Sequence, residues 1–251
     1  MGDKKPLGII ILAAGHGKRM KSDLPKVLHH VGGKPMIAHV IEQAKHLKGS
    51  KIVIVVSNIK GRVASATSHY NVVPVEQKER LGTGHAILQT KDKFSDFDGN
   101  ILILSGDVPL LSQMTLDKLV HRHYVYGAAA TVLTTIFENP AGYGRVVRNS
   151  DGTLNRIVEH KDCTNEQVEI REVNAGVYIF DSRYLFQCLP EVECDNIQGE
   201  YYLPDVLPLI QSMGGKIAVE TVEDTREVAG INTQEQLLEM NRIYHELYET
   251  S

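Results

Sequence analysis

Short apolar runs alternate with amphipathic stretches along the first half of the chain, and this alternation restricts the possible folds more than any other feature. The runs at 7–12, 52–56, 72–75 and 101–104 have the length and apolar content of buried strands. Amphipathic stretches lie between them, and the clearest begins at Pro35, since proline suits the first position of a helix. This order predicts an α/β fold with a doubly wound, mostly parallel, Rossmann-like sheet.

The pattern changes after Ala128. Three short strand-like runs, at 129–136, 144–148 and 154–159, are separated by turn signals such as Asn139-Pro140. They predict antiparallel additions to the sheet, and we expect these additions to form one wall of a cleft. The remaining expected elements are a strand at 177–180, a helix at 203–212, a strand at 217–219 and a final helix that starts with a Thr233-x-x-Gln236 capping box.

The overall charge and the cysteine content exclude several classes of protein. The 251 residues include 27 basic and 31 acidic side chains, and the formal net charge of −4 argues against a surface that coats nucleic acid. The longest apolar runs are far shorter than the ~20 residues of a membrane span, so no membrane insertion is expected. The three cysteines form no Cys-x-x-Cys pair, which is typical of reduced thiols in a cytoplasmic protein.

A glycine-rich, basic loop follows the first predicted strand. The stretch Leu12-Ala13-Ala14-Gly15 carries little side-chain bulk at its end, so its backbone N–H groups are able to approach an anionic ligand. Arg19 and Lys26 follow and supply charge to neutralise a polyphosphate. The spacing matches neither the P-loop pattern nor the three glycines of dinucleotide-binding folds. An ordinary tight turn and a solvated basic loop are the alternative interpretations.

A carboxylate at the end of the strand at 101–104 predicts a magnesium site. Asp107 lies directly past this strand, at the carboxyl edge where doubly wound folds bind ligands. Beside a polyphosphate loop, such a carboxylate suits Mg²⁺, which takes one or two carboxylates and completes its shell with water and phosphate oxygens. Asn232 is a candidate second oxygen ligand. Turn or helix-capping roles are the alternatives for both residues.

Gln77, Gly82 and Thr83 lie just before a predicted helix. An amide side chain and an accessible glycine backbone match the donor and acceptor edge of a pyrimidine ring. The alternative is a capped start of the helix.

Gly144, Glu159 and Asn174 lie on the predicted antiparallel wall. Glu159 is able to accept hydrogen bonds from two neighbouring sugar hydroxyls, Asn174 both donates and accepts, and Gly144 lets the backbone approach a ligand closely. Each of them is also a common hairpin-turn residue. Together they predict a sugar-binding wall.

In order along the chain, these motifs resemble the uridylyltransferase domain of bacterial bifunctional N-acetylglucosamine-1-phosphate uridyltransferases, in the sugar-phosphate nucleotidyltransferase superfamily. The resemblance covers residues 7–232. It is carried by Leu-Ala-Ala-Gly-x-Gly-x-Arg-Met from Leu12, Pro-Lys-Val-Leu from Pro25, Leu-Gly-Thr-Gly-His-Ala from Leu81, Gly-Asp-Val-Pro-Leu from Gly106 and Val-Glu-His-Lys-Asp from Val158.

The resemblance implies a role for each matching residue. Arg19 and Lys26 would act on the triphosphate and the transferring phosphate. Asp107 and Asn232 would bind Mg²⁺. The remaining implied contacts are with substrate: Gln77, Gly82 and Thr83 with uracil, and Gly144, Glu159 and Asn174 with the amino sugar. Further candidate substrate-binding residues are Leu12, Ala13, Ala14, Gly15 and Asn232.

The chain departs from the family pattern at Lys18, Ser105 and Ala175, where the family frequently has Thr, Tyr and Thr. It also ends soon after the helix that follows Asn232. We therefore expect no hexapeptide-repeat acetyltransferase domain and no acetyl transfer. The expected organisation is a single domain over 1–251, with a nucleotide-binding half (about 1–127), a sugar-phosphate half (about 128–232) and a C-terminal helix (233–251).

The reaction implied by the resemblance is Mg²⁺-dependent transfer of a uridylyl group from UTP to N-acetylglucosamine 1-phosphate. A phosphate monoester with a second pKa near ~6 is already ionised at neutral pH, so the nucleophile needs no general base. The implied partners are these small molecules, with neither nucleic acid nor membrane, and the oligomeric state is left open. The alternatives are another sugar 1-phosphate such as glucose 1-phosphate, another nucleotide, or a non-catalytic sugar-nucleotide-binding module.

Overall fold

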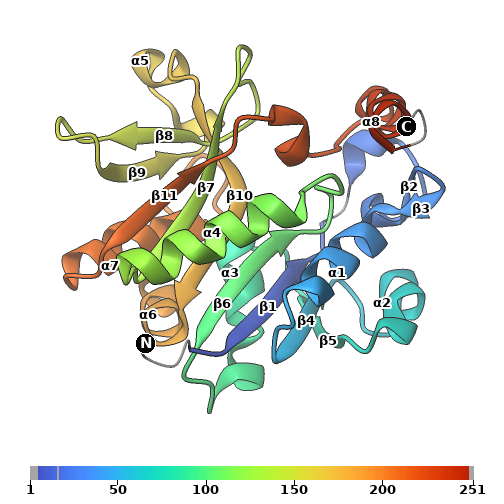
Figure 1. The fold of residues 1–251 in the computed structure, drawn as a ribbon, viewed down its shortest axis with the longest axis horizontal. Helices are drawn as coiled ribbons and strands as arrows, with labels where there is room; N and C mark the ends of the chain where they lie inside the picture. The colour runs from blue at the N-terminus through green and yellow to red at the C-terminus, as the bar shows by residue number, and fades with distance from the viewer. Residues whose placement is uncertain (1–4, 16, 249–251) are drawn as a thin grey trace.

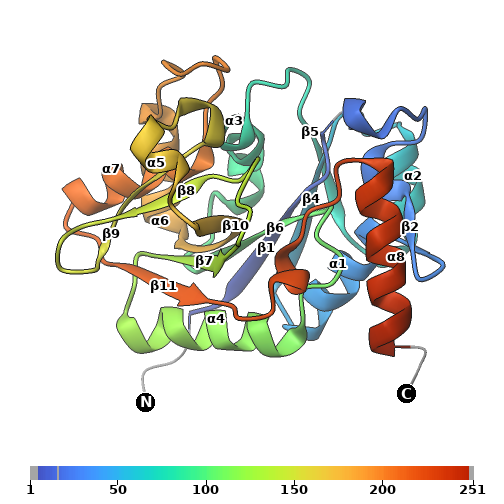
Figure 2. The same ribbon diagram turned by 90° about the horizontal axis from the view of Figure 1, so that it is seen from above.

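A mixed sheet runs through the centre of the protein, with helices on both faces (Figures 1 and 2). The computed structural model describes residues 5–15 and 17–248. The strands of this sheet are β1 (Leu7–Leu12), β4 (Lys51–Val56), β5 (Val73–Glu76), β6 (Asn100–Ser105), β7 (Ala130–Ile136), β8 (Arg145–Arg148), β9 (Leu154–Val158), β10 (Glu172–Asp181) and β11 (Ile217–Thr221). β2 (His30–Val31) and β3 (Lys34–Pro35) form a separate small hairpin.

The strand directions confirm the expected fold class. The order is β11-β7-β10-β6-β1-β4-β5, and β6, β1, β4 and β5 are parallel neighbours. β10 runs antiparallel to both β6 and β7, while β8 and β9 form an antiparallel extension beside β10. The carboxyl ends of β1 and β6 therefore share one edge of the sheet with the amino end of β10.

Helices cover the two faces in separate groups (Figure 2). On one face lie α1 and α4, and on the other α3, α6 and α7. The helices are α1 (Met36–His46), α2 (Arg62–Thr67), α3 (Thr83–Leu88), α4 (Gln113–Tyr126), α5 (Asn165–Val168), α6 (Ser182–Cys188), α7 (Val206–Ser212) and α8 (Gln234–Tyr248). None of the helices in the described ranges is both long and apolar enough to cross a membrane.

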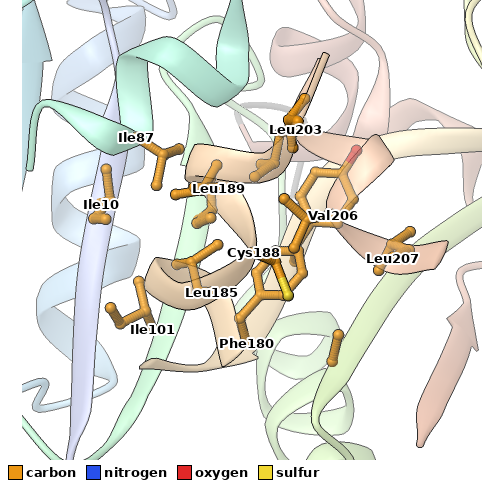
Figure 3. Packing of buried hydrophobic residues seen from close by; sticks show 14 of the residues in the cluster. Ile10, Ile87, Ile101, Phe180, Leu185, Cys188, Leu189, Leu203, Val206 and Leu207 are labelled. Atoms are coloured by element: carbon orange, nitrogen blue, oxygen red, sulfur yellow. The ribbon is translucent and has the colours of Figure 1, made fainter. Parts of the chain in front are cut away.

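β1 is apolar on both sides because both sides of the sheet are covered. Ile10 belongs to the cluster that includes Ile87 of α3 and Leu185 of α6, shown in Figure 3. Ile9 and Ile11 point to the opposite cluster, which α1 and α4 complete. All three isoleucines of the strand are fully buried, so β1 is anchored from both faces and holds the loop that follows it in place.

Three helices were not expected from the sequence, and one strand is longer than predicted. α4, α5 and α6 lie in segments without a predicted element, and β10 begins at Glu172 instead of about residue 177. The ends of α4 do carry helix signals: the Ser112 hydroxyl accepts a hydrogen bond from Thr115 N (3.1 Å), and Gly127 closes the helix with a φ of 53°. The earlier start of β10 matters because it places Asn174 within the strand.

The C-terminal helix α8 packs beside the segment that follows β1. The Gln236 backbone N–H donates to the Thr233 hydroxyl (3.2 Å), and the Gln236 side chain accepts from Thr233 N (3.2 Å), so the capping box is confirmed. Met240 is buried in a small cluster with Met20 and Met36, and Tyr244 packs against it. The helix thereby connects the segment after Asn232 with the segment that follows β1.

Candidate active site

The loop after β1 forms part of the lining of a cavity of about 540 Å³, to which Leu12, Ala13, Ala14 and Gly15 all contribute. Gly106 N–H donates to the Leu12 carbonyl (2.9 Å), so the ends of β1 and β6 are joined. A Cβ on Gly15 would meet no atom within 4 Å. The missing side chain at this position therefore leaves room in the cavity, as expected of a loop that receives a ligand.

Position 17 requires glycine for its backbone conformation and for its close approach to Lys26. Its φ is +60°, and a Cβ there would lie 2.6 Å from the Cβ of Lys26. The short helix that Lys26 opens (Lys26–Leu28) is therefore able to pack directly on the loop. This close approach brings the Lys26 side chain to the edge of the cavity, and Lys26 is one of its lining residues.

Four predicted residues from distant parts of the chain meet beside this loop. The ammonium of Lys26 lies 2.5 Å from Asp107 Oδ2 and 2.9 Å from Asn232 Oδ1. Arg19 Nη2 donates to the same Asn232 oxygen at 3.0 Å. Ile231 N–H donates to the Asp107 carbonyl (3.1 Å), so the segment before α8 is held against the end of β6. The structure thus brings together the two predicted catalytic residues and the two predicted metal ligands.

The donor set of Asp107 and Asn232 fits Mg²⁺. Their oxygens converge on one point, which the Lys26 ammonium now occupies as a stand-in cation. A carboxylate and an amide are the hard oxygen ligands that Mg²⁺ accepts, with phosphate oxygens and water for the rest of its shell. Within 5–15 and 17–248 there is no group of three or more His, Cys, Asp or Glu side chains suited to a metal. A metal at this point would therefore depend on substrate oxygens.

The segment before α3 contributes another part of the cavity lining. The Gln77 side chain is buried and donates to the Gly82 carbonyl (3.0 Å). Gly82 has a φ of +108°, and a Cβ there would lie 2.5 Å from the carbonyl oxygen of Tyr201, so a side chain does not fit. The Thr83 hydroxyl accepts from Leu203 N at 3.0 Å. Gln77, Gly82 and Thr83 line the same cavity as Lys26 and Asp107, as the sequence predicted.

Gly144, Glu159 and Asn174 also lie close together. Asn174 N–H donates to the Gly144 carbonyl (2.9 Å), and a Cβ on Gly144 would lie 3.3 Å from Glu159 Oε1. The Asn174 side chain is already engaged, because it donates to the Tyr178 hydroxyl (2.5 Å) and accepts from Gly176 N (3.0 Å). Asn174 therefore orders the turn at Gly176, which reaches the end of β6 through a hydrogen bond from the Ser105 hydroxyl (3.3 Å).

Glu159 lies in an acidic environment that the sequence did not predict. It lines a second cavity, of about 710 Å³, together with Asp162 and Asp205. Burial raises the pKa of the Glu159 carboxyl to about 7, and the neighbouring carboxylates of Asp205, Asp162 and Glu200 add to this rise. Burial, with Asp162, also raises the pKa of Asp205 to about 6. The side chain expected to bind a sugar thus changes its charge near neutral pH.

Sequence reasoning missed several side chains of the first cavity. Lys18, Arg80 and Glu200 line it, and Ser105 lies at its floor beside Asp107. Lys18 and Arg80 stand inside the two motifs that were singled out, and their positive charge was the available signal. Glu200 belongs to the stretch Gln-Gly-Glu-Tyr-Tyr-Leu-Pro-Asp from Gln198, which the family resemblance includes, but the sequence assigned it no role. Its place at the cavity depends on the pairing of Gly84 N–H with the Tyr201 carbonyl (2.7 Å).

Comparison with known proteins gives matches over most of the chain. The family model described as "MobA-like NTP transferase domain" matches residues 9–162. The "Bifunctional protein GlmU" of Listeria welshimeri is 42% identical over 234 residues, which is 93% of this chain and 51% of that protein. The protein of the same name from Halalkalibacterium halodurans is 45% identical over 234 residues, with the same coverage of 93% and 51%. The chain thus spans about half the length of these relatives.

A solved structure supports the fold. The crystal structure of a UDP-glucose pyrophosphorylase complexed with UDP-glucose superimposes with a TM-score of 0.76 and covers 96% of this chain and 99% of its own. At 18% identity, this likeness concerns the fold alone. The family match over residues 9–162 makes the assignment: the chain belongs to the family of MobA-like NTP transferase domains.

Proposed function

We propose that this protein transfers the uridylyl group of UTP to N-acetylglucosamine 1-phosphate, with release of pyrophosphate. The observation that carries the proposal is the convergence of Arg19, Lys26, Asp107 and Asn232 at the end of β1 and β6. These residues place two cations and two oxygen ligands beside a cavity whose other wall carries Gln77. The similarity to GlmU proteins supports the choice of nucleotide and sugar.

In this proposal the chain acts by position and charge. The phosphate of the sugar attacks the α-phosphorus of UTP, and its oxygen is ionised at neutral pH because its second pKa is near ~6. Arg19 and Lys26 stabilise the negative charge that develops on the departing pyrophosphate. The backbone from Leu12 to Gly15 holds the phosphates, while Gln77, Gly82 and Thr83 hold the uracil ring.

Asp107 and Asn232 are the residues that would hold Mg²⁺. When bound there, the ion supplies charge neutralisation between two phosphate groups that otherwise repel each other. For Asp107 and Asn232 to do so, the Lys26 ammonium has to leave the point where it now contacts both oxygens. Lys26 is then available to the phosphates.

Glu159 provides the first testable prediction. An ionised carboxylate makes stronger hydrogen bonds to sugar hydroxyls than a neutral one, so the KM of wild type for the sugar phosphate is expected to fall as the pH rises through about 7. Glu159→Gln should raise this KM roughly tenfold at pH 8 and have little effect on kcat. Initial rates at pH 6 and pH 8 check both statements. Both proteins share the titration of the substrate phosphate, so a KM ratio that does not change with pH would remove Glu159 from the sugar site.

Stability provides an independent measurement on the same residue. The folded pKa of about 7 lies above the ordinary value of 4.5, so between these values the folded protein keeps a proton that the unfolded chain has released. The Glu159 contribution to the free energy of unfolding therefore decreases as the pH rises through this window. In urea unfolding, Glu159→Gln should gain stability relative to wild type above pH 7 and lose this advantage near pH 4.5.

The proposed function is tested with a panel of substrates. UTP, CTP, ATP and dTTP are each combined with N-acetylglucosamine 1-phosphate, glucose 1-phosphate and a related hexosamine phosphate, and pyrophosphate release is measured with and without Mg²⁺. The proposal requires the highest kcat/KM for UTP with N-acetylglucosamine 1-phosphate. A higher value for another pair would change the assigned substrates and keep the reaction. If none of the pairs releases pyrophosphate, the result would favour a non-catalytic binding module.

A further inference from the structure

Arg80 is a cation of the first cavity without an assigned role. It lies in the segment between β5 and α3, and its Nε donates to the Ala14 carbonyl at 3.1 Å. The segment that carries Gln77 and Gly82 is thereby tied to the loop that follows β1. Arg80 thus connects two segments of the chain that line the same cavity.

The guanidinium of Arg80 keeps most of its donors for a ligand. Only Nε has a hydrogen-bond partner within 5–15 and 17–248; neither Nη atom has a hydrogen bond or ion pair there. Arg80 is largely exposed to solvent and lines the cavity. A guanidinium held at Nε presents its two Nη groups as a fork, which matches the spacing of two phosphate oxygens.

The charges around the cavity indicate what this fork would bind. Lys18, Lys26 and Arg80 line it, against the carboxylates of Asp107 and Glu200, so cations are in excess. The contact with Ala14 holds the guanidinium at the loop whose small residues suit phosphates. A uracil ring has no charge to pair with a guanidinium, whereas a triphosphate has several.

We propose that Arg80 is a further substrate-binding residue, which binds the phosphate groups of the nucleotide in the cavity that Lys18 and Lys26 also line. This inference rests on the proposed function for the identity of the nucleotide, but not for the chemistry, which is a nucleoside triphosphate. It extends the phosphate-binding set beyond Arg19 and Lys26. It also gives Arg80 a structural effect. The same guanidinium would contact both a bound phosphate and Ala14, and so would hold its segment against the loop after β1.

The test compares ligands with and without phosphate. Binding of UTP, inorganic tripolyphosphate and uridine is measured by calorimetry at constant Mg²⁺ for wild type, Arg80→Ala and Arg80→Lys. Arg80→Ala should lower the affinity for UTP and for tripolyphosphate roughly ten- to a hundredfold, because hydrogen bonds between charged groups are lost. The affinity for uridine should not change. Arg80→Lys should recover part of the loss, since it keeps the charge without the fork.

Lys78→Ala is the matched control. Lys78 is exposed, lies in the same segment and does not line the cavity, so its removal changes the net charge equally without touching the ligand. It should bind all three compounds as wild type does. An equal loss of uridine and UTP binding in Arg80→Ala would mean that Arg80 only holds the loop, and an unchanged affinity for UTP and tripolyphosphate would also overturn the proposal.

The same data separate this inference from the proposed function. If wild type prefers another nucleoside triphosphate in the substrate panel, the uridylyl assignment fails. Arg80→Ala should then still lower the affinity for that nucleotide and for tripolyphosphate roughly ten- to a hundredfold. Melting temperatures of all variants establish that the proteins are folded.

Discussion

Replacing Asp107 by Ala is expected to lower kcat by roughly a thousandfold, because the only carboxylate at the meeting point of the four site residues is lost. Asn232 would then be the one remaining protein ligand of the proposed pair, and water and phosphate oxygens would complete the shell of the metal. Asp107→Asn keeps the shape and one oxygen but removes the charge, so its loss should be smaller. Pyrophosphate release as a function of Mg²⁺ concentration measures both variants, and each should require more Mg²⁺ than wild type.

Asp117→Asn serves as the control for this experiment. Asp117 is an exposed carboxylate on α4 whose recorded contact is a hydrogen bond from Gln113 (3.0 Å). Its substitution should leave both kcat and the Mg²⁺ requirement as in wild type. If Asp107→Ala turned over at the wild-type rate at low Mg²⁺, Asp107 would not be a metal ligand, and the proposed roles of its neighbours would have to be revised.

Replacing Lys26 by Ala is expected to act in opposite directions on turnover and on metal binding. Turnover should fall roughly a hundred- to a thousandfold, because a fixed charge at the transferring phosphate is removed. The affinity for Mg²⁺ alone should increase, since the ammonium no longer competes for Asp107 Oδ2 and Asn232 Oδ1. Alanine keeps the Cβ atom that packs near Gly17, so the loop should keep its structure.

Kinetics and a metal titration of Lys26→Ala test whether turnover and Mg²⁺ affinity change in opposite directions. Calorimetric titration with Mg²⁺ in the absence of nucleotide gives the metal affinity, and pyrophosphate release gives kcat. Lys91→Ala, on the exposed short helix before β6, is the control and should match wild type in both. A Lys26→Ala variant that binds Mg²⁺ more weakly than wild type would show that the ammonium does not occupy the metal position.

The parallel part of the sheet was predictable because its strands are buried on both sides. Apolar runs such as those of β1 and β6 have one plausible use in an α/β chain, and the alternation of strand and helix restricts their connections. The glycine loop was predictable for a similar reason, since small residues directly past a buried strand are visible in the sequence. The loop residues and Asp107 followed from their places at these strand ends, whereas the roles of the other candidate site residues came from the resemblance to the uridylyltransferase domain.

Helix α4 was missed because its pattern is weak. Its buried face consists of a few residues, Leu116, Leu119 and His123 among them, while Val125 and Tyr126 are exposed apolar side chains on the same helix. An apolar periodicity with such exceptions resembles a loop or a short strand. The caps at Ser112 and Gly127 were the better signal, because they depend on local backbone geometry and not on packing.

The chain by itself determined the local chemistry of this protein: where strands start, where glycines permit tight turns, and which side chains carry charge or oxygen ligands. Only the tertiary structure decided which of these groups meet. Arg19 and Asn232 are 213 positions apart, and their contact exists because α8 packs beside the segment that follows β1. The position of Arg80 and the raised pKa of Glu159 depend in the same way on neighbours from other elements. Local propensity acts over a few residues, whereas such distances and burial arise only when long-range strand pairing and helix packing close the chain on itself.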